Sequence, residues 1–169
     1  MSEAFVVLGT SRRDGNTARA ARIAFPTTEI VDLNDHAITA YDYEHRYPED
    51  DDFLTLAERM IRRSDIVMAT PVYWYAMSAQ LKLFLDRWSD LITIHKDLGR
   101  ALAGKRLWVL ATSPDPELPP GFEEPFRLTA DYMDMSYAGA LHVICPDDLA
   151  LGAAAQAALV AFGERIRAA

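Results

Sequence analysis

One stretch near the middle of the chain, residues 69–87, constrains the fold most because it joins three kinds of local structure. Residues 66–68 form a short apolar run, which is typical of a strand buried on both faces of a parallel sheet. Pro71 ends this strand because proline lacks the N–H that a sheet ladder uses. Ser78 is a suitable N-cap for a helix. The sequence therefore predicts a buried strand, a loop and a helix in that order.

The helix that begins at Ser78 has one apolar face, because its apolar residues recur at helical spacing. These residues are Leu81, Phe84, Leu85, Trp88, Leu91 and Ile92. The segment that follows, from Lys96 to Gly104, is polar and is predicted to be turn-like.

The loop before this helix carries three consecutive aromatic residues, Tyr73, Trp74 and Tyr75. A single aromatic residue would by default pack in a core. Three in a row cannot all face one interior from a short loop, so some aromatic surface should be exposed, and such surface usually marks an interaction site. Open α/β sheets bind ligands at the carboxyl ends of their strands. We expect this loop to bind a flat conjugated ligand.

A second polar loop, residues 9–17, follows the apolar strand 5–8 and precedes a helix predicted from Ala18 to Pro26. Such loops direct backbone N–H groups and a helix N-terminus at an anion. An ordinary capped turn is the alternative, but a plain cap needs only one polar side chain. This loop offers several: Thr10, Ser11, Asn16 and Thr17 as neutral donors, and Arg12 or Arg13 as a positive charge.

The spacing within this loop argues against a nucleoside triphosphate. A Walker loop would read G-x-x-x-x-G-K-[ST], but Gly9 and Gly15 are separated by one residue too many and Asn16 stands where lysine should. The dinucleotide pattern G-x-G-x-x-G is absent as well. Hydroxyls and amides without a magnesium ligand suit a phosphate monoester. A phosphate monoester joined to a flat ring describes flavin mononucleotide, FMN.

The two loops together resemble one protein family. Residues 9–17 resemble the G-S-x-R-x-x-G-N-T phosphate loop of the flavodoxin-like NAD(P)H-dependent FMN reductases, with Thr10 in place of the usual serine. Residues 69–78 are similar to the isoalloxazine loop of that family, and the similarity continues into the helix at Lys82, Phe84, Asp86 and Arg87. The motifs have the order and separation of the family.

This resemblance implies an FMN-dependent oxidoreductase that passes hydride from NADH or NADPH through bound FMN to a small acceptor. The acceptor could be a quinone, a free flavin, a ferric complex, or an azo or nitro compound. The flavin carries the chemistry, so no side chain is expected to be catalytic. A third loop after the fourth strand touches the flavin ring in the family, although a solvent turn is the alternative. The expected cofactor-binding residues are Thr10, Ser11, Arg12, Asn16, Thr17, Pro71, Val72, Tyr73, Trp74, Tyr75, Met77, Ser78, Thr112 and Ser113.

The rest of the chain alternates apolar strands with helices, which predicts a single doubly wound α/β domain over residues 1–169. The expected arrangement is a five-stranded parallel sheet in the order 2-1-3-4-5 with helices on both faces. FMN would then bind at the switch point between strands 1 and 3. Besides strands 5–8 and 66–71, strands are expected at 29–33, 105–112 and 138–144, and further helices at 53–61, 126–135 and 149–169.

Residues 34–52 are predicted to be irregular, with the acidic run 49–52 starting the next helix. A loop of this length in a compact domain is usually functional or disordered, and its tyrosines argue against disorder. Two interpretations remain open. The loop either helps to cover the flavin or build a subunit contact, or it is a packed surface loop.

Composition excludes several classes of protein. A formal net charge of −8 argues against nucleic acid and anionic membrane surfaces as partners. No apolar run is long enough to span a membrane or form a signal peptide. The single cysteine, Cys145, rules out an internal disulfide and an iron–sulfur site within one chain, and is expected to be an inert buried thiol. The four histidines lack the spacing of metal ligands, which argues against a metal site. No G-x-S-x-G motif is present, which argues against a hydrolase with a serine nucleophile. A reducing cytoplasm is the expected location.

A homodimer or homotetramer is implied by the resemblance. Trp88, Leu91 and Ile92 would supply an apolar contact and Asp86 and Arg87 its polar rim. Alternatively, this helix only covers the sheet.

Two other functions stay open at the level of sequence. One is a flavodoxin-type electron carrier without NAD(P)H activity, for which a strongly acidic face around the flavin would be expected. The other is a non-catalytic module that senses a small ligand.

Overall fold

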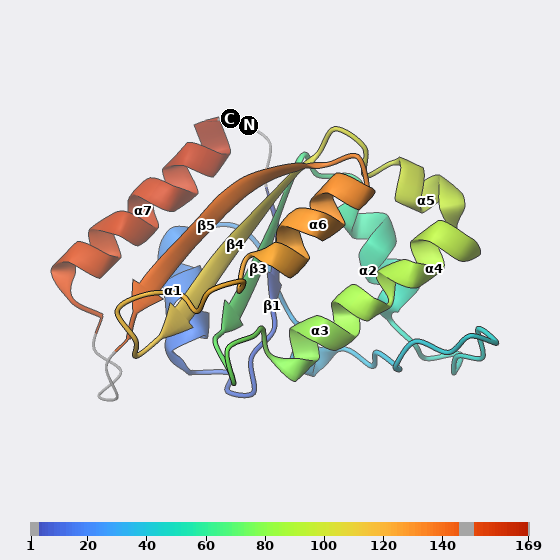
Figure 1. Ribbon diagram of the computed structural model, residues 1–169, viewed down its shortest axis with the longest axis horizontal. Coiled ribbons are helices and arrows are strands. Elements are labelled where there is room, and N and C mark those ends of the chain that lie inside the picture. Colours follow the sequence, from blue (N-terminus) through green and yellow to red (C-terminus); the bar gives the residue numbers. More distant parts are fainter. Residues whose placement is uncertain (1–3, 146–150, 169) are drawn as a thin grey trace.

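Five parallel strands form one sheet in the order β2-β1-β3-β4-β5, as the computed structural model shows for residues 4–145 and 151–168 (Figure 1). The predicted fold class and strand order are confirmed. The central β3 lies between β1 and β4, and every residue of β1 and β3 is buried, as the apolar runs predicted. The strands are β1 (Phe5–Leu8), β2 (Ile30–Asp32), β3 (Asp65–Pro71), β4 (Arg106–Ser113) and β5 (Ser136–Ile144).

Helices cover both faces of the sheet (Figure 1), and the side chains of the strands pack into two separate hydrophobic cores, one on each face. One face packs against α1 (Asn16–Ala24) and α7 (Ala153–Ala168). The other face packs against α2 (Phe53–Met60), α3 (Ala79–Asp86), α4 (Trp88–Thr93) and α6 (Glu124–Tyr132). The short helix α5 (Lys96–Arg100) follows α4, and the 3-10 helix η1 (Leu33–Asp35) follows β2.

The pairing of β4 with the outer strand β5 contains one irregularity. Leu107 pairs with Tyr137, but the next residue, Trp108, pairs with Gly139, so Ala138 is an extra residue in β5. Gly139 has φ 108°, a backbone conformation that residues other than glycine rarely adopt. The glycine therefore permits the bulge.

The helical segment after Ser78 differs from the single long helix that its apolar periodicity predicted. Arg87 ends α3 and begins α4, and Ile92 is 39% exposed instead of joining the buried face. The turn-like segment predicted from Lys96 is also wrong in its first part, because residues 96–100 form α5. This helix packs closely on α4: a Cβ on Gly99 would lie 2.1 Å from the Leu91 carbonyl oxygen.

Three helix boundaries move by a few residues. The first helix begins at Asn16 instead of Ala18. The helix expected over 126–135 is α6, which ends at Tyr132 because Asp134 turns the chain with φ 55°. Of the predicted last helix 149–169, α7 covers Ala153–Ala168, and residues 149, 150 and 169 lie outside the described residues.

Arg87 breaks the helix because it is buried in a polar network, with 3% of its surface exposed. Its Nε donates to Asp90 at 2.9 Å, and its Nη1 donates to Asp51 at 2.8 Å and to the Thr39 carbonyl at 2.9 Å. The guanidinium also lies over the Tyr47 ring, 3.6 Å from its centre. The prediction that Arg87 belongs to the polar rim of a subunit contact is therefore wrong.

The same network holds residues 36–52 against α4. The Tyr47 hydroxyl donates to Asp90 at 3.0 Å, and His45 Nδ1 lies 3.0 Å from the same carboxylate. Trp88 and Leu91 are buried in the core on this face of the sheet, so neither is available for the apolar subunit contact that was expected of them. These contacts favour the interpretation of residues 36–52 as a packed surface loop.

Candidate functional site

Three loops meet at the carboxyl edge of the sheet, after β1, β3 and β4, and enclose a cavity of about 160 Å³. Because these strands are parallel and adjacent, the polypeptide leaves all of them at the same edge. The residues that line the cavity are Thr10, Arg12, Gly15, Asn16, Thr17, Pro71, Val72, Tyr73, Thr112, Ser113, Pro114 and Cys145.

One end of the cavity is electropositive. Helix α1 starts there with Gly15 as its N-cap, and within the described chain no capping side chain accepts from its first amides. Its first turn contains no acidic residue, so the positive end of the helix dipole is not neutralised. The exposed Arg12 lines the cavity, whereas Arg13 is engaged by Asp35 and by the Asn34 carbonyl. This end is suited to an anion.

The first loop is held in place by contacts to α3 and β3. Ser78 Oγ donates to the Gly9 carbonyl at 2.7 Å and accepts from the Leu81 N–H at 3.2 Å, so one hydroxyl caps α3 and fixes the loop. The Gly9 N–H donates to the Ala69 carbonyl at 2.9 Å. A Cβ on Gly9 would lie 2.6 Å from that of Leu81, which explains why only glycine fits here.

Polar side chains of α1 and β4 meet inside the cavity. The hydroxyls of Thr17 and Thr112 lie 2.7 Å apart, which ties the start of α1 to the end of β4. Asn16 Oδ1 is buried and has no hydrogen-bond partner among the described residues. Buried polar atoms are nearly always satisfied, so an unpaired one at a cavity points to a ligand group that would bond to it.

The other end of the cavity is formed by a tight aromatic turn. Tyr73 and Ala76 exchange two backbone hydrogen bonds, at 2.9 and 3.1 Å. Trp74 and Tyr75 occupy the tip with φ values of 49° and 68°, as in a type I′ turn, although large aromatic residues are rarely found in this region. Their side chains are 92% and 73% exposed. The exposed aromatic surface predicted from three consecutive rings is confirmed, and its strained backbone is of the kind found at binding sites.

The third loop contributes a hydroxyl beside a histidine. Ser113 Oγ lies 2.8 Å from Nε2 of His142 on β5. Burial lowers the pKa of His142, and the nearby Asp115 carboxylate acts against this shift. Burial also raises the pKa of the Cys145 thiol, which agrees with the expected inert cysteine.

Residues 3–148 match the family described as NADPH-dependent FMN reductase. The chain belongs to this family. It is 30% identical over 151 residues to YwqN of Bacillus subtilis (strain 168), which is named as an NAD(P)H-dependent FMN-containing oxidoreductase; the match covers 79% of this chain and 80% of the relative. The chain is accordingly an oxidoreductase that uses FMN as its cofactor and NAD(P)H as its electron donor, in place of the carrier and sensor alternatives.

Solved structures agree with this membership. The Trp repressor binding protein from Bacillus subtilis superposes with a TM-score of 0.75 at 25% identity, over 95% of this chain and 96% of that one. The general stress protein 14 from Treponema denticola, solved in complex with FMN, has a TM-score of 0.60 at 16% identity, over 98% and 96% of the two chains. The second likeness supports the flavodoxin-like fold alone.

Nine of the fourteen residues predicted to bind the cofactor line the cavity of this reductase: Thr10, Arg12, Asn16, Thr17, Pro71, Val72, Tyr73, Thr112 and Ser113. Trp74 and Tyr75 project from the turn, and Ser11 lies 3.3 Å from Gln80 Nε2 on α3. The side chains of Met77 and Ser78 are buried, the first in the core and the second as the α3 cap.

Three lining residues were not predicted. Gly15 and Pro114 adjoin predicted residues in the chain, so the motifs pointed to their neighbourhood. Cys145 follows β5, beside β4, and only the strand order could have placed it there.

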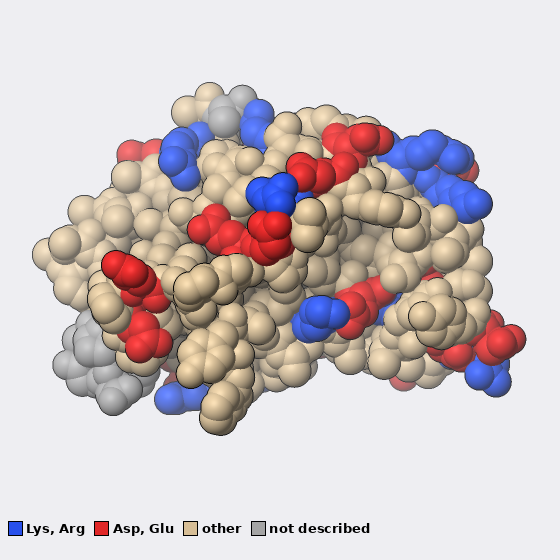
Figure 2. Space-filling model, viewed as in Figure 1, with Lys and Arg blue, Asp and Glu red and all other residues tan. Residues whose placement is uncertain are grey.

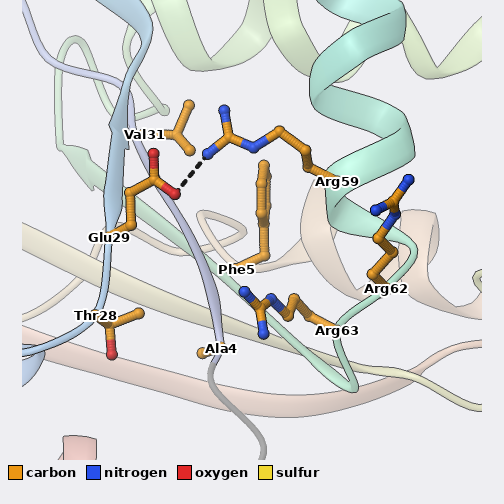
Figure 3. Close-up of a pocket in the computed structure, with 8 residues that line it drawn as sticks. All are labelled: Ala4, Phe5, Thr28, Glu29, Val31, Arg59, Arg62 and Arg63. Atoms are coloured by element: carbon orange, nitrogen blue, oxygen red, sulfur yellow. Dashed lines mark ion pairs between the residues drawn. The ribbon is translucent and has the colours of Figure 1, made fainter.

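A different cavity, of about 310 Å³, lies at the opposite edge of the sheet beside Ala4 (Figure 3). Phe5 forms part of its wall, and Arg59 is paired with Glu29 at 2.7 Å. Arg59 and Arg62 lie at the C-terminal end of α2, where cations stabilise the helix dipole without any ligand. The arginines beside this cavity are therefore explained by the fold itself, and the cavity at the carboxyl edge is the candidate site.

Among residues 4–145 and 151–168, no group of three histidine, cysteine or carboxylate side chains is arranged to hold a metal ion. None of the helices in that part of the chain is both long and apolar enough to cross a bilayer.

Proposed function

We propose that this reductase binds FMN in the cavity between the three loops and transfers electrons from NADH or NADPH to a small acceptor. A quinone, a free flavin, a ferric complex, or an azo or nitro compound would serve as acceptor. One observation carries the proposal: the cavity joins an unopposed helix N-terminus to an exposed aromatic turn. This pairing suits a ligand with a phosphate at one end and a flat ring at the other.

The phosphate of FMN would be held by the start of α1. Its free amides, the Thr10 and Thr17 hydroxyls and the Arg12 guanidinium offer donors and positive charge to a phosphate monoester. The Asn16 amide would bond to the same ligand in two ways: its Nδ2 would donate to the phosphate, and its unpaired Oδ1 would accept from a hydroxyl of the ribityl chain. Ser11 borders this group on the solvent side.

The ring of FMN would lie between the aromatic turn and the third loop. Pro71, Val72 and Tyr73 would form one wall, and Thr112 and Ser113 the facing one. Trp74 and Tyr75 would extend the aromatic surface toward solvent, where a nicotinamide or an acceptor could stack. Met77 and Ser78 would act indirectly by fixing the turn to the core and to α3.

Bound FMN supplies the hydride chemistry, and the chain supplies binding, orientation and electrostatics. The positive end of α1 and Arg12 stabilise negative charge in the cavity. The buried Thr17–Thr112 contact keeps the two loops at a fixed separation and excludes water between them.

The first test is a visible absorbance spectrum of the purified protein under anaerobic conditions, before and after NADH or NADPH is added. Flavin bands that bleach within the mixing time of one donor would support the proposal and identify that donor. Bands that persist with both donors would contradict NAD(P)H oxidation, and absent bands after soaking with FMN would contradict the assignment of the cavity.

The residue assignment is tested by Asn16→Ala. We expect FMN affinity to fall about 10- to 100-fold, because a hydrogen bond from Asn16 Nδ2 to the charged phosphate would contribute roughly 1.5–3 kcal/mol. Thr27→Ala, just beyond the other end of α1, is the matched control and should leave the dissociation constant unchanged. Equal affinities of all three proteins, measured by flavin fluorescence quenching, would exclude Asn16 from the site.

We further propose that the chain forms one cytoplasmic domain that assembles into a homodimer or homotetramer. Since Trp88, Leu91 and Arg87 are buried, a subunit contact would have to use other surface, such as the exposed Ile92 and Ile94. Light scattering at two protein concentrations would measure the oligomeric state.

A further inference from the structure

Ser113 and His142 connect the cofactor cavity to the outer strand of the sheet. Ser113 is the last residue of β4, is 5% exposed and lines the cavity. His142 lies on the neighbouring β5, is only partly buried, and is not part of the cavity wall. Its Nε2 is 2.8 Å from Ser113 Oγ, so a single hydrogen bond joins a residue within reach of water to a hydroxyl inside the cavity.

His142 is also the group best suited to exchange protons there. The ionisable side chains in the described lining are those of Arg12, Tyr73 and Cys145. Arginine, tyrosine and cysteine ordinarily keep their protons well above neutral pH, and burial raises the pKa of Cys145 further. Histidine titrates near neutrality. Burial lowers the pKa of His142, and Asp115, in the loop that follows β4, is the charged group that opposes this shift.

The proposed reaction needs a proton that its electron donor does not supply. NAD(P)H gives up one hydride, which is two electrons and one proton, whereas a quinone becomes a hydroquinone by gaining two electrons and two protons. The second proton must therefore reach the cavity from water.

We propose that Ser113 and His142 form the path by which this proton enters the cavity. The inference rests on the proposed function. Protonated His142 donates its Nε2 hydrogen to Ser113 Oγ, and the Ser113 hydroxyl then directs its own hydrogen into the cavity. As the Nε2–H bond breaks and a new O–H bond forms at Ser113, the original serine proton passes to the anionic oxygen of the acceptor. Ser113 is left a neutral hydroxyl, His142 is left neutral, and water reprotonates it.

The two residues have different roles. Ser113 faces the reactants and is assigned as a catalytic residue, whereas His142 acts through Ser113 and is a positioning residue that sets the direction of its hydroxyl. Because the two act as one unit, removing either should have the same effect as removing both.

The closing experiment isolates the acceptor step from the use of NAD(P)H. The FMN-loaded protein is reduced anaerobically by illumination with EDTA as the electron donor. It is then mixed in the dark with 2-methyl-1,4-naphthoquinone, and flavin reoxidation is followed across about pH 5 to 9, the range in which histidine titrates. The proteins compared are wild type, Ser113→Ala, His142→Gln and the double variant. His95→Gln is the matched control because His95 lies between α4 and α5, away from the cavity.

We expect reoxidation at neutral pH to slow on the order of 100-fold in each of the three variants, which is typical of losing a general acid. The fall in wild-type rate with rising pH should disappear in them, and Ser113→Thr, which keeps a hydroxyl, should restore much of the rate. A Ser113→Ala protein with the wild-type pH profile would overturn the proposal, as would a loss of rate that simply follows loss of FMN.

A second readout does not depend on activity. The pKa of His142, measured by NMR titration of its ring protons, should rise when FMN is bound, because the negative ligand stabilises the imidazolium. If the pKa of His142 were the same with and without FMN, His142 would not sense the ligand in the cavity, and the proposal would be overturned. Failure of NADH and NADPH to bleach the wild-type flavin would instead contradict the proposed function alone, since EDTA supplies the electrons in the reoxidation experiment.

Discussion

At the scale of single residues, Asn16 and Arg87 show two ways in which a polar side chain can be buried. Arg87 is satisfied within the chain by Asp51, Asp90 and a backbone carbonyl. Asn16 keeps a buried oxygen unpaired among the described residues, at the wall of the cavity. The first arrangement serves the stability of the fold, and the second leaves bonding capacity for a ligand.

Replacing Arg87 should be strongly destabilising. Arg87→Met would leave the carboxylates of Asp51 and Asp90 buried without their counterion, and such a loss costs about 3–5 kcal/mol. We expect the free energy of unfolding in urea to fall by that amount. Arg100→Met is the control, because Arg100 pairs with Asp97 at the surface and such pairs contribute at most about 1 kcal/mol. Equal losses in the two variants would contradict the structural role of Arg87.

The same network makes stability depend on acid pH. Burial alone would raise the pKa of Asp51, but the hydrogen bonds from Arg87 and from the Thr39 and Phe53 amides outweigh it and hold that pKa below its ordinary value. A lowered pKa in the folded state adds stability above the pKa of an unfolded aspartate, near 4, and this stability is lost as pH falls further. Asp51→Asn should unfold at lower denaturant overall but with a shallower decline below about pH 4. An unchanged decline would exclude Asp51 as a contributor.

The sequence predicted residue types at the site better than the direction of each side chain. The G-x-x-x-x-x-G-N-T pattern brought Thr10, Asn16 and Thr17 together, and all three line one cavity. Asn16 and Thr17, however, are the first residues of α1 and not part of the loop. For Met77 and Ser78 the same reasoning could not decide between cavity and core, since both residues follow a turn whose direction depends on the positive φ of Trp74 and Tyr75.

At the scale of elements, strands were easier to predict than helix ends. Fully apolar runs leave a buried parallel strand as the simplest interpretation, and β1, β3 and β4 lie where these runs are. The break between α3 and α4 had no local signal. It depends on Arg87 reaching Asp51, which is 36 residues away in a loop without regular structure. Helix α5 was missed because its short polar sequence is stabilised by close packing of Gly99 on α4.

The backbone of the aromatic turn is strained and should lower the stability of the fold. Left-handed backbone costs a residue with a side chain about 1–2 kcal/mol, and both Trp74 and Tyr75 adopt it. The double variant Trp74→Asn/Tyr75→Gly, which has the preferred sequence of a type I′ turn, should unfold at higher temperature and bind FMN more weakly. Trp74→Phe/Tyr75→Phe keeps the strain and is the control. If both variants melted at the same temperature, the strain would be absent.

At the scale of the whole molecule, the order of the strands assembles the site. Loops that are far apart in the sequence meet only because β1, β3 and β4 are neighbours and point the same way (Figure 1). Charge plays a smaller part. Acidic and basic side chains are interspersed over the face seen in Figure 2, and that face lacks the continuous acidic field expected of an electron carrier.

Because the cavity belongs only to the folded protein, ligand binding should stabilise the whole fold. FMN at about 100 times its dissociation constant should add roughly 2.7 kcal/mol to the free energy of unfolding. Riboflavin, which lacks the phosphate, should add much less, because the N-terminus of α1 and Arg12 would have no anion to bind. Thermal melting with each ligand measures the difference. Equal shifts would place the electropositive end of the cavity outside the binding site.

The bulge opposite Trp108 bears on how readily two copies of the protein would associate through the edge strand β5. β5 is an outer strand of nine residues, long enough to offer its unpaired backbone groups to a neighbouring molecule. The extra residue Ala138 and the unusual backbone of Gly139 bend this strand and break its regular row of donors and acceptors. A strand from another molecule would therefore meet an irregular edge, with which it cannot form a continuous ladder of hydrogen bonds. We expect this irregularity to disfavour edge-to-edge pairing between copies of the chain.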